Sequence, residues 1–416
     1  MSNARTTQRW VEFAGERWTS DVSLTYSAAR DEVTLHRTDE AGAIRSEVVG
    51  TDIWSALRDH LDAGLTAVGY LGYACRRDLP ARPSADLPDA VLLLCEGGRG
   101  EAGTAARPAS SQTSAGISLA TPAVVEARAA SASGTVRDTA PAAYVAAFAQ
   151  VQEALHAGDT YETNLTYRLT RTSDRTPEEI RAALEATPYS GMMVHDVPGA
   201  RAWLISASPE RFARIEDGTI ETKPIKGTMP RSADAAEDMA NAERLRTDQR
   251  FRAENLMITD LLRNDVSQVC APGTVEVPRL MEVESYASVH QLVTTVRGRL
   301  RAGVTALEAV HALFPAGSMT GAPKLRTMEI IDRLEQPPAF GGPRGVYAGA
   351  FGRVGRDQAD LGVVIRSLTS PDGRTWTLGT GGGVTVHSAV EEEYAETRWK
   401  AARLLAALEQ PDAPES

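Results

Sequence analysis

The sequence predicts a strand-rich α+β fold that is not built from repeated β-α-β units. Over residues 21–26, 32–37 and 91–95, short apolar runs are separated by turn residues, which is typical of strands. Later in the chain, helix-like patterns at 142–156, 248–264 and 388–408 stand between strand-like runs at 161–170 and 286–300. With 42% hydrophobic and 24% charged residues, the composition is that of a globular protein with an ample core.

The composition divides the chain into three regions. Residues 8–96 form a strand-rich N-terminal region. Residues 97–140 are rich in Gly, Ala, Ser, Thr and Pro, and are predicted to be a linker or surface loop. Residues 141–410 carry the sharpest helix and strand patterns, so we expect the functional site there.

Charge and cysteine usage exclude several classes of protein. The net charge is −11, which disfavours binding to nucleic acids or to anionic membranes. The spacing of the 3 cysteines suits neither a disulfide framework nor a zinc site. The sequence has no long apolar run, so we expect a soluble, cytoplasmic protein. An anionic substrate would need a local cluster of positive charge.

Lys226 is the most informative residue. It follows a strand-like run at 219–222 and a proline, and it is followed by Gly227 and Thr228, which together place an amine and a hydroxyl at a strand exit. The lysine could be a solvated charge. It could also be a nucleophile or an anion clamp, if burial lowers its pKa enough to free the amine.

Three glutamates stand out on the predicted helices. Glu254 falls within an apolar stripe of helix 248–264, where it needs a partner such as a nearby arginine. Ser388 begins a capping-box pattern, and Glu393, Glu396 and Lys400 then lie along one edge of the helix that follows. Two carboxylates one turn apart can share a divalent cation, although Glu396 and Lys400 could equally form a surface ion pair.

Two polar residues lie in apolar strands. His290 shares a face of strand 286–300 with apolar residues, so it is either a satisfied core residue or a catalyst. Arg366 lies within an apolar run and needs an anion, either an internal carboxylate or a ligand. Glycine clusters at 317–321 and 379–383 could bring backbone N–H groups close to an anion, or could serve only as turns.

A series of motifs, in this order, resembles the chorismate-utilising enzymes. The resemblance is dense from about residue 161 to 408 and looser over 69–95. Its motifs are Ser-Pro-Glu-Arg-Phe at 208–212, Pro-Ile-Lys-Gly-Thr at 224–228, Arg-Ala-Glu-Asn-Leu at 252–256, Leu-Arg-Asn-Asp at 262–265, Val-His-Gln-Leu-Val at 289–293, Ser-Met-Thr-Gly-Ala-Pro-Lys at 318–324, Ile-Arg at 365–366, and Glu393 to Lys400.

Within the family, the resemblance implies an activity. Anthranilate, isochorismate and salicylate synthases usually carry Ala where this chain has Lys226, whereas component I of aminodeoxychorismate synthase carries Lys. Glu162 stands where the isochorismate and salicylate enzymes have a water-activating lysine. The resemblance therefore implies Mg²⁺-dependent amination of chorismate at C4 by ammonia. The alternatives are an anthranilate synthase component I and a non-catalytic relative that binds an amidotransferase.

The resemblance also assigns roles. Lys226 would attack ring C2, Glu210 would protonate the leaving C4 hydroxyl, and His290 would assist proton transfer or orient the ring. Glu254, Glu393 and Glu396 would hold Mg²⁺. The substrate carboxylates would be anchored by Thr228, Thr320, Arg366, Lys400 and the backbone near Gly382 and Gly383.

The implied fold has two packed antiparallel sheets flanked by helices, with the site in a cleft between the halves. Residues 8–96 would be the N-terminal region of the anthranilate synthase component I type, and 141–410 the chorismate-binding catalytic domain. We find no glutaminase region with a thiol nucleophile, so a separate glutamine amidotransferase subunit would supply ammonia. Two residues depart from the family pattern: Phe251 replaces an acidic residue, and Arg353 replaces an aromatic one.

Overall fold

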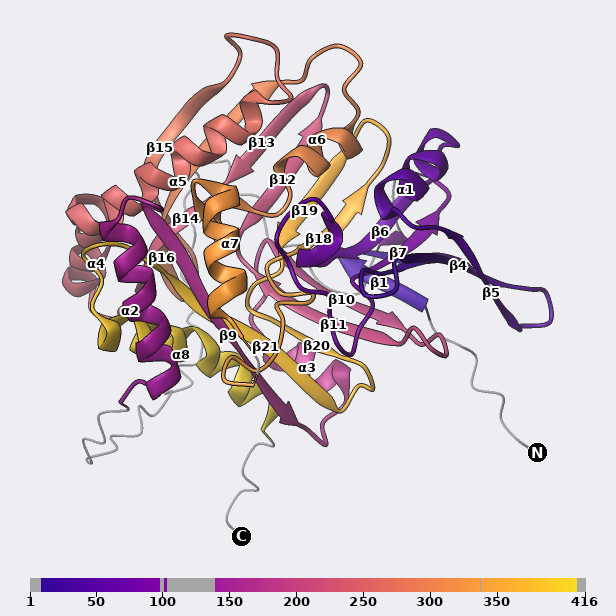
Figure 1. Ribbon diagram of the computed structural model, residues 1–416, viewed down its shortest axis with the longest axis horizontal. Coiled ribbons are helices and arrows are strands. Elements are labelled where there is room, and N and C mark those ends of the chain that lie inside the picture. Colours follow the sequence, from indigo (N-terminus) through magenta and orange to yellow (C-terminus); the bar gives the residue numbers. More distant parts are fainter. Residues whose placement is uncertain (1–8, 98–100, 103–138, 337, 410–416) are drawn as a thin grey trace.

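The strands form two antiparallel sheets, which confirms the predicted α+β class. The computed structural model describes residues 9–97, 101–102, 139–336 and 338–409. Figure 1 shows the N-terminal strands and α1 at one end of the molecule, with α4 and α5 at the other. None of the helices in these ranges is long and apolar enough to cross a membrane.

The first sheet has nine strands, and β9 lies near one edge. In spatial order they are β17 (Gly321–Ala322), β9 (Glu162–Thr172), β21 (Thr375–Val384), β20 (Ser367–Ser370), β11 (Ala202–Ser208), β10 (Tyr189–His195), β1 (Arg9–Phe13), β2 (Glu16–Thr19) and β8 (Glu101–Ala102).

The second sheet has twelve strands, and β14 lies at one edge. In spatial order they are β14 (Ile225–Pro230), β16 (Val289–Arg299), β13 (Thr219–Lys223), β12 (Arg211–Glu216), β19 (Ala359–Val363), β18 (Ala350–Val354), β6 (Thr66–Leu71), β7 (Ala90–Cys95), β3 (Val22–Ser27), β4 (Glu32–Thr38) and β5 (Ile44–Gly50), with β15 (Glu276–Ser285) paired to β16.

The helices follow the predicted apolar periodicity. The predicted helix at 142–156 is α2, with those bounds. The capping box expected from Ser388 is wrong: α8 begins after Ala389, and the Ser388 hydroxyl instead donates to Glu393, 2.7 Å away. The helices are α1 (Ile53–Asp62), α2 (Ala142–His156), α3 (Pro177–Ala183), α4 (Ala235–Thr247), α5 (Gln249–Ser267), α6 (Ala306–Leu313), α7 (Lys324–Leu334) and α8 (Val390–Leu408), with short 3-10 turns η1 (Tyr73–Cys75) and η2 (Gly317–Met319).

Strands of the first predicted region are shared between the two sheets. Strand β1 pairs with β10, and β6 pairs with β18, so residues 8–96 are hydrogen-bonded to the region that begins at 141. The boundaries of the three regions remain a prediction. Most of the predicted linker at 97–140 lies outside the described residues.

Aromatic side chains pack the two sheets together. Phe13 of the first sheet meets Phe351 of the second edge-to-face, with ring centroids 5.4 Å apart. Both rings are almost fully buried, together with Tyr70 of the second sheet. Such contacts between the inner faces bury most of the apolar surface that stabilises a sandwich.

A buried ion network fixes β9 against the segments beside it. Glu335 pairs with Arg168 at 2.9 Å and with Arg344 at 2.7 Å, and all three side chains are buried. Arg344 also donates to the backbone carbonyls of Met319 and Asn164. The network therefore sets the position of η2 relative to β9.

Removing the shared carboxylate should destabilise the fold. We expect Glu335→Ala to lower the free energy of unfolding by about 3–5 kcal/mol, because two buried guanidinium groups lose their counter-charge. Urea denaturation measures the change. Glu329→Ala is the matched control, since Glu329 forms an exposed pair with Arg326 on the same helix and should cost less than about 1 kcal/mol. Equal losses in the two variants would contradict the role of the network.

Candidate functional site

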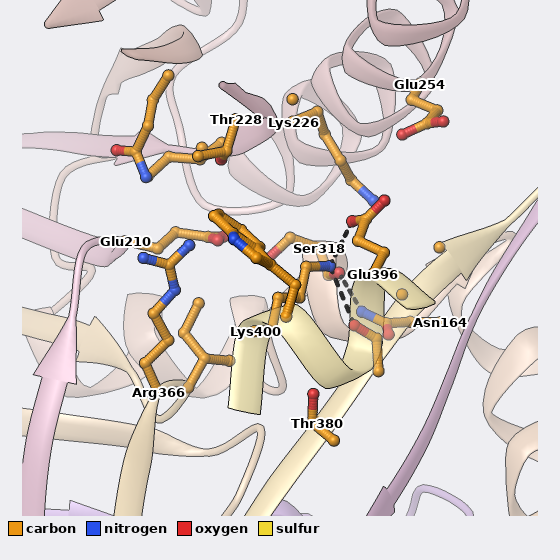
Figure 2. A pocket seen from close by; sticks show the side chains of 18 of the residues that line it. Asn164, Glu210, Lys226, Thr228, Glu254, Ser318, Arg366, Thr380, Glu396 and Lys400 are labelled. Atoms are coloured by element: carbon orange, nitrogen blue, oxygen red, sulfur yellow. Dashed lines mark hydrogen bonds and ion pairs between the residues drawn. The ribbon is translucent and has the colours of Figure 1, made fainter. Parts of the chain in front are cut away.

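A cavity of about 480 Å³ lies where the two sheets meet. Its walls come from β14 and β16 of the second sheet, from β9 and β21 of the first, and from α5 and α8. Figure 2 shows side chains of Lys226, Glu210, Arg366 and Lys400 surrounding one space. The location agrees with a cleft between the halves.

Most of the predicted site residues line this cavity. The structure brings together ten of them from distant parts of the chain: Glu210, Lys226, Thr228, Glu254, Arg366, Gly382, Gly383, Glu393, Glu396 and Lys400.

His290 and Thr320 are the exceptions. His290 is hydrogen-bonded between Ser285 at 2.7 Å and Asp238 at 3.0 Å, and it does not line the cavity. Because side chains alternate along a strand, the next residue, Gln291, lines the cavity instead. Thr320 is fully buried and donates to the carbonyl of Gly317 at 3.1 Å, so it does not line the cavity either.

A β-bulge presents Lys226 to the cavity. Between the pairs Ile225–Val293 and Thr228–Gln291, strand β14 has one more residue than β16. Gly227 lies within this bulge and has a φ of +91°. Lys226 and Thr228 therefore both reach the cavity wall, on either side of the glycine.

The Lys226 amine forms a buried ion pair with Glu162. Burial is the largest single effect and lowers the pKa of Lys226, but the carboxylates of Glu162, Glu254 and Glu210 together outweigh it. The pKa is consequently raised above its ordinary value. The condition considered from the sequence, that burial lowers the pKa enough to free the amine, is therefore not met in the ligand-free site, because the carboxylates favour the protonated lysine.

Glu210 is suited to donate a proton. The side chain is buried, and burial raises the pKa of Glu210 from 4.5 to about 7, against the opposing effects of Ser318, Lys226 and the other cations nearby. The Ser318 hydroxyl donates to the Glu210 carboxylate and fixes its direction. Near neutral pH, Glu210 can therefore carry a proton and lose it.

Two cations, Arg366 and Lys400, line the same cavity as Glu210. Arg366 lies between β19 and β20 with a φ of +47°, an uncommon backbone conformation for a bulky residue, and its guanidinium lies 6.0 Å from the Trp399 ring. Lys400 donates to the carbonyl of Gly381 at 3.0 Å and pairs with Glu396 at 2.7 Å. The surface ion pair considered from the sequence thus forms, but at the cavity wall, where both cations can meet an anionic ligand.

The three predicted metal ligands line the same cavity without forming a cluster. The pKa of Glu254 is raised to about 7, chiefly by burial and also by the neighbouring carboxylates Glu162, Glu393 and Glu396, against the effect of Lys226. In the described part of the chain, no group of three or more His, Cys, Asp or Glu side chains is close enough together to hold a metal ion. The crowding of carboxylates fits a hard divalent cation, but the ligand geometry is not assembled in this structure.

The two departures from the family pattern occupy different surroundings. Phe251 lines the cavity and packs over Gly227, where an added Cβ would lie 3.1 Å from the ring. Arg353 pairs across the sheet with Asp360 and does not line the cavity.

Sequence reasoning missed several polar side chains of the cavity wall, among them Asn164 and Gln291. Asn164 and Gln291 are both buried, and each has a side-chain oxygen without a hydrogen-bond partner among the described residues. Asn164 lies two positions after Glu162 on β9, hence on the same face, and this alternation could have pointed to it.

The raised pKa of Glu210 should make stability depend on pH. Because the folded protein binds this proton more tightly than the unfolded chain, the contribution of Glu210 falls as pH rises from 4.5 to about 7 and remains lost above that. As the pH rises from about 5 to about 8, we expect the free energy of unfolding of Glu210→Gln to increase by roughly 3 kcal/mol relative to that of the wild type. Urea denaturation at both pH values measures the gain. The exposed Glu216 serves as control, and an equal pH response in Glu216→Gln and Glu210→Gln would contradict the assignment.

Comparisons with known proteins agree with this geometry. Residues 7–406 match the family of chorismate binding enzymes. Aminodeoxychorismate synthase from Streptomyces pristinaespiralis is 49% identical over 261 residues, which cover 62% of this chain and 35% of that protein. The match thus spans little more than a third of that relative's own length.

Two further proteins extend the similarity along the chain. Anthranilate synthase component 1 from Streptomyces coelicolor is 34% identical over 411 residues, covering 88% of this chain and 79% of that protein. The crystal structure of anthranilate synthase component I from Streptococcus pneumoniae has a TM-score of 0.69 at 22% identity, covering 97% of this chain and 94% of that one, and it shows the fold alone. The chain belongs to the family of chorismate binding enzymes.

Proposed function

We propose that this chain acts as component I of an aminodeoxychorismate synthase, converting chorismate and ammonia into 4-amino-4-deoxychorismate. The observation that carries the proposal is the placement of the Lys226 amine in one cavity with the Glu210 carboxyl. The relative at 49% identity bears the same name.

Cations of the cavity wall would hold the substrate. Chorismate carries two carboxylates, and Arg366 and Lys400 supply positive charge at the cavity wall. The Thr228 hydroxyl and the backbone at Gly382 would add neutral hydrogen bonds. An anionic substrate requires such a local cluster of positive charge, because the net charge of the whole chain is −11.

The chemistry would proceed in two displacements. The Lys226 nitrogen forms a bond to ring C2 while the C4–O bond breaks, and Glu210 donates its proton so that the hydroxyl leaves as water. Ammonia then bonds to C4 as the C2–nitrogen bond breaks and releases the lysine. His290 does not line the cavity, and its part in proton transfer or ring orientation stays a prediction.

Glu254, Glu393 and Glu396 would hold a Mg²⁺ ion. Their oxygen donors suit this hard cation, which would neutralise the ring carboxylate when bound. We further propose that a separate glutamine amidotransferase supplies the ammonia in the cytoplasm, in keeping with the name component 1 of the relative at 34% identity.

Anthranilate synthase component I is the second candidate, because the match to the relative of that name covers 79% of the relative's length. Lys226 opposes it, since anthranilate formation in this family usually proceeds with Ala at the position. A non-catalytic relative is the third, with Phe251 and Arg353 as its support. Arg353 lies outside the cavity wall, and Lys226 and Glu210 are both in place within it.

Product identification tests the proposal directly. We expect the purified chain, given chorismate, Mg²⁺ and ammonium, to form aminodeoxychorismate, which an added aminodeoxychorismate lyase turns into 4-aminobenzoate. Lys226→Ala should abolish this product, because no amine remains to attack C2. Mass spectrometry identifies the products.

Lys223→Ala is the matched control for this experiment. Lys223 lies three positions before Lys226, pairs with Glu284 at 2.6 Å and does not line the cavity, so its loss should leave the product unchanged. Anthranilate as the product would contradict the proposed reaction. Unchanged aminodeoxychorismate formation by Lys226→Ala would exclude the lysine as nucleophile.

Calorimetric titration tests the metal assignment. We expect Mg²⁺ to bind the wild type, and Glu254→Gln or Glu396→Gln to weaken it by at least about tenfold, as the loss of a charged ligand should exceed an outer-sphere effect. Glu391→Gln is the control, because Glu391 is an exposed glutamate of the same helix. Equal Mg²⁺ affinity in Glu254→Gln and the wild type would argue against this ligand set.

A further inference from the structure

Phe251 is the departure from the family pattern that lies at the cavity wall. It belongs to the first turn of α5, three positions before Glu254, and it is half-buried. The proposed reaction gives it no part. An aromatic ring among the polar groups of this cavity therefore calls for a reason other than chemistry.

The Phe251 ring packs against the backbone that carries the nucleophile. Gly227 follows Lys226 in the bulge of β14, and its φ of +91° is one that residues with a side chain rarely adopt. A Cβ added at Gly227 would lie 3.1 Å from the Phe251 ring and 3.1 Å from Leu245 Cδ2. Two apolar side chains thus close the space beside the Cα of Gly227, which holds the bulge in place.

Leu245 and Phe251 stand on either side of one helix junction. Asp248 ends α4, where its backbone N–H donates to the carbonyl of Arg244 at 2.9 Å. It also begins α5, where its carboxylate accepts from the backbone N–H of Arg250 at 2.9 Å. Because both helix ends are capped at this residue, the junction has a fixed shape, and the two apolar side chains meet the bulge from fixed positions.

Arg250 extends this packing to α8. Its guanidinium lies 5.2 Å from the centre of the Phe251 ring and pairs with Glu392 of α8 at 3.3 Å. Phe251 thereby connects the strand that carries Lys226 with the helix that carries Lys400. The nucleophile and one of the cations for the substrate are tied to each other through this ring.

We propose that Phe251 is a positioning residue for the nucleophile: by packing on Gly227 it fixes the bulge of β14, and with it the direction from which the Lys226 amine approaches the substrate. This inference rests on the proposed function. A flexible lysine side chain reaches the reacting carbon more often from a fixed backbone than from a mobile one. An acidic side chain at position 251 could not pack in this way without losing its hydration.

Steady-state kinetics and hydrogen exchange test this role together. We expect Phe251→Ala to lower kcat for aminodeoxychorismate formation about 10-fold to 100-fold, since a small displacement of a reacting group has an effect of this size. The KM for chorismate should change by less than about threefold, because Arg366 and Lys400 still hold the substrate. Amide exchange over residues 225–230, followed by mass spectrometry, should become at least about tenfold faster. Phe251→Leu restores an apolar contact and should keep all three quantities within about threefold of the wild type.

Leu256→Ala is the matched control, since Leu256 is an apolar residue of α5 that is 55% exposed and does not line the cavity. It should change none of these quantities. A wild-type kcat or a wild-type exchange rate in Phe251→Ala would overturn the role, as would a failure of Phe251→Leu to recover activity.

A second variant covers the case in which Phe251→Ala does not fold. Phe251→Val keeps part of the apolar contact, so it must then lower kcat and speed exchange over residues 225–230 to a smaller degree, and wild-type values in it would overturn the role. Absence of aminodeoxychorismate from the products of the wild type would contradict the proposed function alone, because the exchange rates still judge the packing of Phe251 on the bulge.

Discussion

The buried carboxylate of Glu335 is the interaction on which the cavity depends. It neutralises Arg168 and Arg344 at once, and Arg344 reaches the carbonyls of Asn164 and Met319. Those two residues lie side by side in the cavity wall on different elements, β9 and η2, so their relative position is fixed by a rigid, planar guanidinium rather than by loose loops. The cavity is thus built on an ion network whose three side chains do not themselves line it.

Charges are also paired within the cavity. Lys226 is neutralised by Glu162 and Lys400 by Glu396, so each amine is held in place before any ligand arrives. On the proposed function, a divalent cation and a dicarboxylate substrate enter together and leave the net charge of the site unchanged. Ion pairing then offsets the free-energy cost of burying charge at every stage, as a cleft of low dielectric constant requires.

Sequence reasoning predicted the elements and the membership of the cavity well, because both follow from short-range patterns. Apolar periodicity located α2, and motif order gathered residues as distant as Glu210 and Lys400 into one site. It could not tell His290 from Gln291, since adjacent residues of a strand point to opposite faces and both are polar. Nor could the sequence show that Thr320 lies behind the cavity wall, where its hydroxyl donates to the Gly317 carbonyl of its own turn.

The protonation state of Lys226 shows why partners matter more than burial. Burial alone favours the neutral amine, and the sequence suggested no more than that. The partner comes from Glu162, far away in the sequence, on a strand of the other sheet, so only the fold reveals it. A lysine held as an ammonium ion cannot attack, so on the proposed function substrate binding would have to supply the conditions for its proton to move. The nucleophile would then form only when the substrate is present, which would protect the amine from other electrophiles.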